Sequence, residues 1–297
     1  MSVASDISFA STLPMIQVNF ASGQARCSAR TTASTWQVSP IADRRRMQTR
    51  RGGAGRMAAM KFERIAIGGG AILYDPSRAG NAPAALFDLD AWRRRGAARE
   101  MSGGRGSIVF LGDDAQGLVL RRYLRGGFAA RFSRDAYFYT GEQRTRAFHE
   151  LRLLGALVDL DLPVPAPVAA RYVRTRLAYR AELVTARLPP CDTLAARWLA
   201  GSMRIADWRA VGACLQRFHR AGVQHVDLNA NNVMLGSAGQ VWLLDFDRGR
   251  LRPPGPWQDA VLARLERSLA KLAGLNPGAP DWREGMLALR SAHDGGA

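Results

Sequence analysis

The stretch HVDLNANN, residues 225–232, lies between two apolar runs and combines a histidine, an aspartate and three asparagines. Asn and Asp are common in turns, so by itself the stretch could be an ordinary surface loop. Eighteen residues after Asp227, however, the apolar run Leu243-Leu244 ends in Asp245. Packing explains such an aspartate poorly, whereas carboxylate oxygens are natural ligands for Mg²⁺, which usually binds substrate phosphates as well. The rest of the chain has to decide whether Asp227 and Asn232 belong to such a site or only shape a turn.

A glycine-rich turn precedes two predicted strands in the first half of the chain. Residues 103–107, GGRGS, lead into strands predicted over 107–111 and 118–123, whose turn chemistry predicts a hairpin. Glycines let backbone N–H groups approach a phosphate chain, and Arg121 on the return strand could pair with phosphates. Each feature also has an ordinary alternative, because glycine turns are common in hairpins and both Arg121 and Arg122 could be solvated strand ends.

Glu150 lies three, four and seven residues before leucines of a helix predicted over 145–158, and therefore shares their apolar face. A carboxylate on such a face is costly to bury unless it is paired. It either reaches solvent at the helix edge or pairs with a basic group of the neighbouring sheet. Arg121 is the candidate partner.

The composition and periodicity of the sequence change at two points along the chain. Residues 1–60 are polar and basic without helical or strand periodicity, which predicts a non-folded extension; a transit peptide, or a start assigned too far upstream, are the other interpretations. Strands dominate the first half of the part that follows, and helices dominate the second half. Further helices are predicted over 205–221 and 260–272.

The formal net charge of +17 comes almost entirely from arginine, since Lys61 and Lys271 are the only lysines. A charge this large implies an anionic partner, such as nucleic acid, a membrane surface, or a substrate with phosphate or carboxylate groups. A guanidinium group can bind carboxylate or phosphate through two parallel hydrogen bonds, which suits discrete anions as well as a nucleic acid. The three cysteines are scattered and have no CxxC spacing, which excludes a disulfide framework and predicts a reducing compartment.

In their order along the chain, these features resemble the protein-kinase-like superfamily. The spacing H-x-D-x-x-x-x-N, with Asn232 five residues after Asp227, and the D-F pair beyond a predicted hairpin match its catalytic loop and metal site. The glycine turn, the strand cation and the helix glutamate precede them as in that superfamily. The resemblance implies an α+β fold of two lobes, with a β-rich N-terminal lobe over residues 61–187 and a mainly helical C-terminal lobe over 188–290.

Within that superfamily the chain resembles the 3-deoxy-D-manno-octulosonic acid (Kdo) kinases. The matching features are Gly-Arg-Gly in the glycine turn and the stretches RRYLRGG, HVDLNANNVML, LLDFDRGR and RLERSLAKL, within about residues 61–275. The chain departs from protein kinases in three ways: Asp247 at the third position of D-F-G, arginine where lysine is expected, and no A-P-E motif. The resemblance implies ATP-dependent phosphorylation of the Kdo 4-hydroxyl on a lipid A precursor, in lipopolysaccharide inner-core biosynthesis.

The resemblance also implies roles for the residues of the two short motifs. Asp227 would accept or orient the proton of the sugar hydroxyl, because phosphoryl transfer depends mainly on positioning and charge stabilisation. Asn232 and Asp245 would hold Mg²⁺ on the ATP phosphates. His225 is expected to be structural, with a hydrogen bond near the D-F turn. Asp247 could be a second metal ligand or only a turn residue.

The first half of the chain would bind the nucleotide. Arg121, held by Glu150, would contact the ATP phosphates, and its register in the strand favours it over Arg122. Backbone N–H groups of the glycine turn would cover these phosphates, through Gly104, Gly106 and Ser107.

The acceptor and the membrane would account for the arginine excess, since Kdo carries a carboxylate and lipid A carries phosphates. No apolar run approaches the roughly 20 residues that span a bilayer, so membrane contact would be peripheral, at the cytoplasmic face of the bacterial inner membrane. Between residues 121 and 146 arginines alternate with aromatic residues, which suits anionic headgroups, although a solvated loop is the alternative. These arginines are Arg125, Arg131, Arg134, Arg144 and Arg146. No obligate protein partner is indicated.

Three other functions compete with this interpretation. An aminoglycoside-type phosphotransferase shares the catalytic-loop spacing, but it binds cationic acceptors, for which carboxylates rather than arginines are expected. A protein kinase is disfavoured by the missing A-P-E motif. A nucleic-acid-binding protein without catalysis would use the positive charge simply, but that function leaves Asp227, Asn232 and Asp245 unexplained, so no nucleic-acid partner is expected.

Overall fold

The structure of this protein is a computed structural model. It describes residues 60–101, 108–113, 117–123 and 137–295, and all of these belong to one compact unit. The predicted extension, except for its last residue, lies outside the described residues. So do the predicted phosphate-covering residues Gly104, Gly106 and Ser107.

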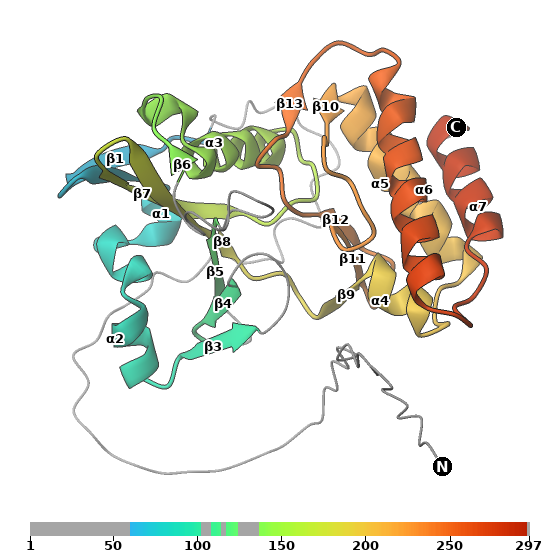
Figure 1. Cartoon of the computed structure of the whole chain (residues 1–297), viewed down its shortest axis with the longest axis horizontal. Coiled ribbons are helices and arrows are strands. Elements are labelled where there is room, and N and C mark those ends of the chain that lie inside the picture. Colours follow the sequence, from blue (N-terminus) through green and yellow to red (C-terminus); the bar gives the residue numbers. More distant parts are fainter. Residues whose placement is uncertain (1–59, 102–107, 114–116, 124–136, 296–297) are drawn as a thin grey trace, which may run out of the picture. The chain divides into compact units, whose positions relative to one another are not determined.

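Eight strands in the described part of the chain form one antiparallel sheet (Figure 1). Their order is β1-β2-β7-β8-β5-β4-β3, and β6 pairs with one end of β8. The predicted hairpin is confirmed, because β4 and β5 pair with Ile108 opposite Arg121. The strands are β1 (Glu63–Ile67), β2 (Gly70–Tyr74), β3 (Ala98–Met101), β4 (Ile108–Leu111), β5 (Leu118–Arg122), β6 (Tyr137–Phe138), β7 (Pro167–Thr175) and β8 (Ala178–Ala186).

Different helices cover the two faces of this sheet. On β2, Leu73 belongs to a cluster that contains Phe148, whereas the adjacent residue Ile72 belongs to a cluster that contains Phe87. This alternation is what a strand buried on both faces requires. Phe148 belongs to the long helix α3 (Arg146–Asp159), which follows η4 (Glu142–Arg144), and the opposite face is covered by α1 (Pro76–Ala79), η2 (Pro83–Phe87) and α2 (Leu89–Arg94).

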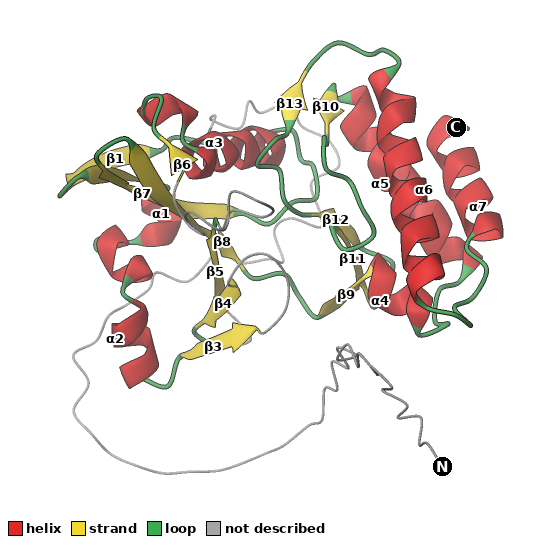
Figure 2. Cartoon of the chain, in the orientation of Figure 1, coloured by secondary structure: helices red, strands yellow, loops and turns green. Residues whose placement is uncertain are grey.

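The second half of the chain is mainly helical, as predicted (Figure 2). Its helices are α4 (Leu194–Leu199), α5 (Ile205–Arg220), α6 (Trp257–Leu275) and α7 (Arg283–Asp294). Two small sheets accompany them: β9 (Cys191–Thr193), β11 (Val233–Gly236) and β12 (Val241–Leu243), and the pair β10 (Val223–Gln224) and β13 (Arg250–Leu251). None of the helices that the structure describes combines the length and the apolar character needed to cross a membrane.

Helices α5 and α7 pack closely because each has a glycine at the contact. A Cβ atom added to Gly212 would lie 2.1 Å from the carbonyl oxygen of Leu289, and one added to Gly285 would lie 2.2 Å from the ring of Trp208. A side chain at either position would therefore force the two helices apart.

One apolar core connects the sheet to these helices. Phe148 of α3 and Tyr172 of β7 belong to the same cluster of buried residues as Leu228, Leu243 and Phe246, and residues of α5, α6 and α7 complete it. The polar motifs at 225–232 and 245–247 are thus attached to the core through the buried residues between their polar ones.

The α+β class, with strands first and helices second, is confirmed. Helices α3 and α5 begin and end within one residue of the predicted ranges, and α6 is longer than predicted. Strand β7 and helix α7 were not predicted. Strand β7 begins at Pro167, and a first residue can be proline without breaking the ladder. A lobe boundary near residue 188 stays a prediction.

Candidate active site

The stretch 225–232 forms a loop that its own asparagines hold in shape. The side chains of Asn229 and Asn232 both donate to the carbonyl oxygen of Asp227, at 2.9 and 3.1 Å. Leu228 and Ala230 are fully buried and anchor the loop in the core. The asparagines are therefore turn-formers, and the turn that they form leaves 28% of the Asp227 side chain exposed.

Asp245 is held beside this loop by bonds to the residue before it. The backbone N–H of Leu244 donates to the carbonyl oxygen of Asn232 at 2.9 Å, and Nε2 of His225 lies 2.7 Å from the Leu244 carbonyl oxygen. Asp245 has a φ of 65°, in the left-handed region that non-glycine residues rarely adopt. Such a conformation persists only where the surrounding structure fixes it, and it is common at functional sites.

Arg121 joins the sheet to both of these elements through one guanidinium group. Its Nη1 donates to Oδ1 of Asp245 at 2.6 Å, while its Nη2 pairs with Glu150 and donates to the Tyr123 hydroxyl at 3.1 Å. The predicted ion pair between Arg121 and Glu150 is therefore present. Burial lowers the pKa of Arg121, but the charges of Glu150 and Asp245 more than reverse this and raise the pKa well above its ordinary value.

Glu150 has a donor on each of its carboxylate oxygens, which a buried carboxylate requires. Only 2% of its side chain is exposed. Oε2 accepts from Arg121 and from the Tyr123 hydroxyl, and Oε1 accepts from the backbone N–H of Phe246 at 3.1 Å. Tyr123, which the sequence did not single out, thus completes the network, and Glu150 ties α3 to the segment that follows β12.

Arg122 has a different environment from its neighbour. Its Nε donates to Glu182 of β8 at 3.1 Å, and Glu182 also pairs with Arg171 of β7. Adjacent residues of a strand point to opposite faces, so Arg122 cannot share the position of Arg121. Of the two candidates, only Arg121 contacts Glu150 and Asp245.

Asp247 pairs with Arg146, in the first turn of α3. The sequence left open whether Asp247 is a metal ligand or a turn residue, and neither interpretation anticipated this contact. Arg146 also donates to the Tyr137 hydroxyl at 3.0 Å. Arg146 and Glu150 are one helical turn apart, so α3 is joined to the segment 245–247 at two points.

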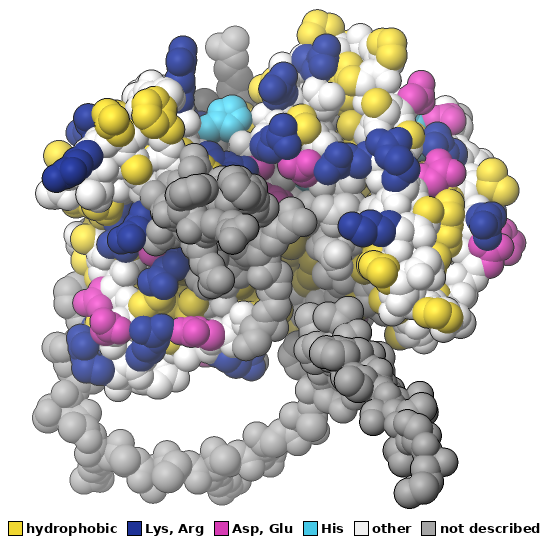
Figure 3. All heavy atoms as spheres, in the orientation of Figure 1, with side chains coloured by type: hydrophobic (Ala, Val, Ile, Leu, Met, Phe, Trp, Pro, Cys, Tyr) yellow, Lys and Arg dark blue, Asp and Glu magenta, His cyan; other side chains and the backbone are white. Residues whose placement is uncertain are grey.

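Asp227 itself is contacted by two arginines that lie in the stretches LLDFDRGR and RLERSLAKL, but to which the sequence assigned no role. Nη2 of Arg264, on α6, lies 2.7 Å from Oδ1 of Asp227, and Nη1 of Arg248 lies 3.5 Å from Oδ2. These arginines are 46% and 60% exposed, so this cluster is open to solvent. In Figure 3, Lys and Arg side chains are spread over the visible face of the protein and outnumber Asp and Glu.

His225 is structural, as expected. Its ring is buried and lies 4.6 Å from the ring of Phe246. Burial lowers its pKa, although the bond to the Leu244 carbonyl opposes the shift, and the ring is therefore neutral near pH 7. Since a carbonyl oxygen only accepts, the proton lies on Nε2, and the role of the ring is to fix the backbone before Asp245.

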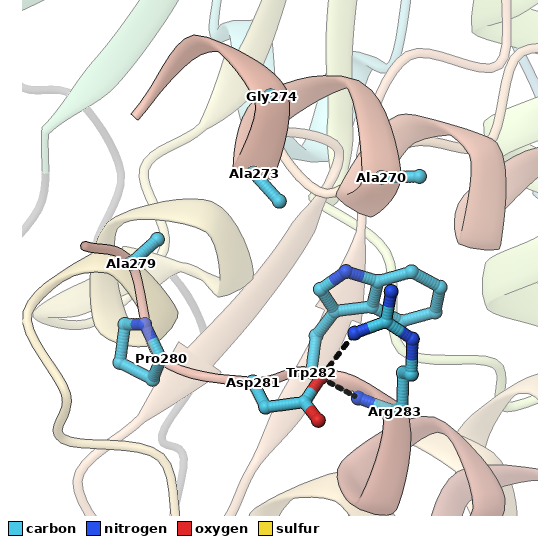
Figure 4. Close-up of a pocket in the computed structure, with 8 residues that line it drawn as sticks. All are labelled: Ala270, Ala273, Gly274, Ala279, Pro280, Asp281, Trp282 and Arg283. Carbon is cyan, nitrogen blue, oxygen red and sulfur yellow. Dashed lines mark hydrogen bonds and ion pairs between the residues drawn. The ribbon is translucent and has the colours of Figure 1, made fainter. Parts of the chain in front are cut away.

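A groove elsewhere in the protein lacks the groups that phosphate chemistry needs. It has a volume of about 480 Å³ and lies between the end of α6 and the start of α7 (Figure 4). Alanines, Pro280 and Trp282 line most of it, and its charged groups, Asp281 and Arg283, pair with each other at 3.1 Å. The residues around Asp227 and Asp245 are therefore the stronger candidate site.

Comparisons with known proteins identify a family of kinases. Residues 89–284 match the family model "Lipopolysaccharide kinase (Kdo/WaaP) family". The chain is 49% identical over 210 residues to a 3-deoxy-D-manno-octulosonic acid kinase of Xanthomonas axonopodis pv. citri (strain 306), covering 70% of this chain and 83% of that protein. It is 44% identical over 227 residues to a 3-deoxy-D-manno-octulosonic acid kinase of Stenotrophomonas maltophilia (strain K279a), covering 76% and 90%.

A comparison with solved structures gives a weaker likeness. A crystal structure of WbdD is 18% identical to the chain, with a TM-score of 0.41. The matched region covers 66% of this chain and 45% of WbdD.

Proposed function

This chain belongs to the lipopolysaccharide kinase (Kdo/WaaP) family, and we propose that it transfers the γ-phosphoryl group of ATP to the 4-hydroxyl of Kdo on a lipid A precursor. The observation that carries this proposal is the contact of Arg121 with both Glu150 and Asp245, beside the loop that carries Asp227. This contact places a phosphate-binding cation, Arg121, beside a metal-binding carboxylate, Asp245, and the adjoining loop carries the proton acceptor, Asp227. High identity to Kdo kinases supports Kdo as the acceptor.

Asp227 acts on the acceptor in this proposal. Its carboxylate takes the proton of the sugar hydroxyl as the hydroxyl oxygen bonds to the γ-phosphorus. The bond from that phosphorus to the bridging oxygen of ADP breaks at the same time, and ADP leaves. The side-chain bonds from Asn229 and Asn232 to the Asp227 carbonyl fix the backbone from which the carboxylate projects. Such positioning is the main source of catalysis in phosphoryl transfer.

Arg121 binds the ATP phosphates, and Glu150 and Tyr123 orient it. The guanidinium group has limited freedom, because its two terminal nitrogens already contact three side chains. About a quarter of the side chain, 23%, is exposed and can meet a ligand. The glycine turn with Gly104, Gly106 and Ser107 is proposed to cover the same phosphates.

Asn232 and Asp245 fit a magnesium ion by their chemistry. Both offer oxygen, the ligand atom that Mg²⁺ prefers, and the ion usually takes only one or two carboxylates together with phosphates and water. One carboxylate oxygen of Asp245 pairs with Arg121, while the amide nitrogen of Asn232 is used by the Asp227 carbonyl. The second carboxylate oxygen of Asp245 and the amide oxygen of Asn232 are then available for the ion. When bound, Mg²⁺ neutralises charge on the phosphates.

The metal site can be tested by nucleotide binding alone. Asp245→Ala should abolish the increase in ATP affinity that Mg²⁺ causes, measured by calorimetry with and without the ion. Asp247→Ala is the matched control, because that carboxylate pairs with Arg146. Unchanged Mg²⁺ dependence in Asp245→Ala would exclude Asp245 as a ligand.

The activity is tested by presenting the protein with three acceptors: a Kdo-bearing lipid A precursor, an aminoglycoside and a generic protein substrate. We expect transfer of labelled phosphate from ATP to the first only, with a product phosphorylated at the Kdo 4-hydroxyl. Transfer to either of the others at a comparable rate would favour the corresponding alternative function. DNA binding without any turnover of ATP would favour a nucleic-acid-binding protein.

We also propose that the protein binds peripherally to an anionic membrane, at the cytoplasmic face of the inner membrane. Of the segment predicted for this contact, Arg125, Arg131 and Arg134 lie outside the described residues. Among the described residues, Leu177 and Phe138 are 66% and 63% exposed, and Phe138 of β6 pairs in register with Ala178 of β8, the residue after Leu177. Exposed arginines lie within three residues of Leu177 in the sequence: Arg174, Arg176 and Arg180. Apolar side chains flanked by arginine suit the interface of an anionic bilayer.

This surface is tested with vesicles that contain phosphatidylglycerol. Replacing Leu177 and Phe138 together by Gln should weaken binding at least about tenfold, because each buried side chain contributes about 1.5–3 kcal/mol. Leu287→Gln is the matched control, since Leu287 on α7 is 69% exposed. Equal effects of the two changes would mean that the membrane is bound elsewhere.

A further inference from the structure

The two arginines at Asp227 give the acceptor side of the site a positive charge. Arg264 and Arg248 contact different oxygens of one carboxylate, which neutralises only one of the two cations. Within the part of the chain that the structure describes, no other acidic side chain pairs with either arginine. The cluster therefore has an excess of one positive charge at the residue that faces the acceptor hydroxyl.

Asp227 does not need these arginines to hold its position or to take a proton. The Asn229 and Asn232 side chains and the buried Leu228 already fix the loop. A proton acceptor also works less well when cations hold its oxygens. The arginines must therefore serve another group that reaches the same place.

The contacts at Asp227 are of the kind that a ligand can replace. All three side chains are partly exposed, and exposed ion pairs contribute only about 0–1 kcal/mol. Exchanging one carboxylate for another leaves the charge of the cluster unchanged. A guanidinium group also presents the paired donors that a carboxylate accepts.

We propose that Arg264, assisted by Arg248, binds the carboxylate of the sugar-acid acceptor and releases Asp227 to act on its hydroxyl. This inference rests on the proposed function. In Kdo the carboxylate and the 4-hydroxyl belong to the same sugar. Binding of the carboxylate therefore fixes the orientation of the hydroxyl relative to Asp227. Neutral and cationic sugars lack the group that displaces Asp227 from its arginines, and this makes Arg264 a residue that determines specificity.

The test combines a change in the protein with a change in the acceptor. Wild type and Arg264→Gln are each assayed with a Kdo-bearing lipid A precursor and with the same compound whose Kdo carboxylate has been converted to a carboxamide. In wild type, the amide should lower kcat/KM by about 10- to 100-fold, the loss of charge-assisted hydrogen bonds worth about 1.5–3 kcal/mol. In Arg264→Gln, kcat/KM for the acid acceptor should fall by a similar factor, and kcat/KM for the amide should change by less than about threefold. The KM for ATP should stay the same, and Arg264→Lys should restore part of the loss.

Arg267→Gln is the matched control, because Arg267 is exposed one turn further along α6 and makes no described ion pair with Asp227. This change should alter kcat/KM for the two acceptors by the same factor. Melting temperatures of all variants check that each is folded. If Arg264→Gln lowers kcat/KM for both acceptors by the same factor, Arg264 does not bind the carboxylate and the inference is wrong. A wild-type protein that phosphorylates neither acceptor would instead refute the proposed function, on which the inference depends.

Discussion

The networks around Arg121 and around Asp227 are built from the same groups in opposite proportions. Around Arg121, one guanidinium group meets two carboxylates, and Glu150 is almost fully buried. Around Asp227, one carboxylate meets two guanidinium groups, and every member is partly exposed. The first network thus has a negative excess that suits a metal ion, and the second has a positive excess that suits an anionic acceptor.

Burial decides what each network contributes. Removing one partner of a buried ion pair leaves an uncompensated charge, whereas an exposed pair loses little. The Arg121 network should therefore determine stability and assembly of the site, and the Asp227 cluster should determine turnover and acceptor choice with little effect on stability. The predictions below test this division, beginning with the largest effect.

Replacing Asp227 by Asn should separate activity from stability most clearly. The carboxamide cannot accept the hydroxyl proton, and we expect a fall in kcat of about 10²–10⁴, the usual contribution of general base catalysis. The melting temperature and the ATP affinity should stay close to wild type. Activity within tenfold of wild type would exclude Asp227 as the base.

Replacing Glu150 by Ala should have the largest effect on stability. It removes the Arg121 partner inside the core, and we expect a loss of about 3–5 kcal/mol in the free energy of unfolding, measured by urea titration. Arg121→Ala should combine with it non-additively, with a coupling of about 0.5–3 kcal/mol. Arg122→Ala is the control on the same strand, and because its pair with Glu182 is more exposed, it should cost about 1 kcal/mol or less. If the stability losses of Arg121→Ala and Glu150→Ala simply add in the double variant, the pair does not act as a unit.

The pair of Arg146 and Asp247 is intermediate in exposure, at 31% and 9%, and should be intermediate in effect. Asp247→Ala should cost about 1–3 kcal/mol, the usual loss when a buried hydrogen-bonded partner is removed. It should also lower kcat, because α3 loses one of its two attachments to the segment 245–247. Arg144→Gln, at an exposed position just before α3, should change neither quantity. A stability loss as large as that of Glu150→Ala would contradict the ranking by burial.

Salt should produce the smallest effect and should act on only one network. Raising the ionic strength from 0.05 to 0.3 M screens exposed charges, since the screening length is about 10 Å at 0.1 M. The KM for the acid acceptor should rise by a few-fold, while the KM for ATP changes less. In Arg264→Gln this dependence on salt should be weaker, and an unchanged dependence would mean that other charges attract the acceptor.

The contact between Arg121 and Glu150 could be predicted because Glu150 was anomalous by itself. A carboxylate on an apolar helix face requires a cation, and a cation lay on the neighbouring predicted strand. The loop of Asp227 and Asn232 could be predicted because all its members lie within a few residues of one another. In both cases a short-range pattern left few possible partners.

The contacts of Arg146 with Asp247 and of Arg264 with Asp227 could not be predicted in the same way. Their members are 101 and 37 residues apart, and the sequence contains so many arginines that no local pattern selects one. The place of helix α7 in the fold could not be predicted either. Its place against α5 depends on the close approach at Gly212 and Gly285, and a glycine in the sequence does not reveal what packs against it.

The apolar core that the sheet shares with the helices α5 to α7, and that includes Phe148 and Leu243, has a calorimetric consequence. Two halves with separate cores would melt in two steps, each with its own enthalpy. A shared core makes loss of packing in either half a loss for both, so the described part of the chain should unfold in one cooperative transition whose van't Hoff and calorimetric enthalpies agree. A destabilising change beside the sheet and one between α5 and α7 would then shift the same heat-capacity peak.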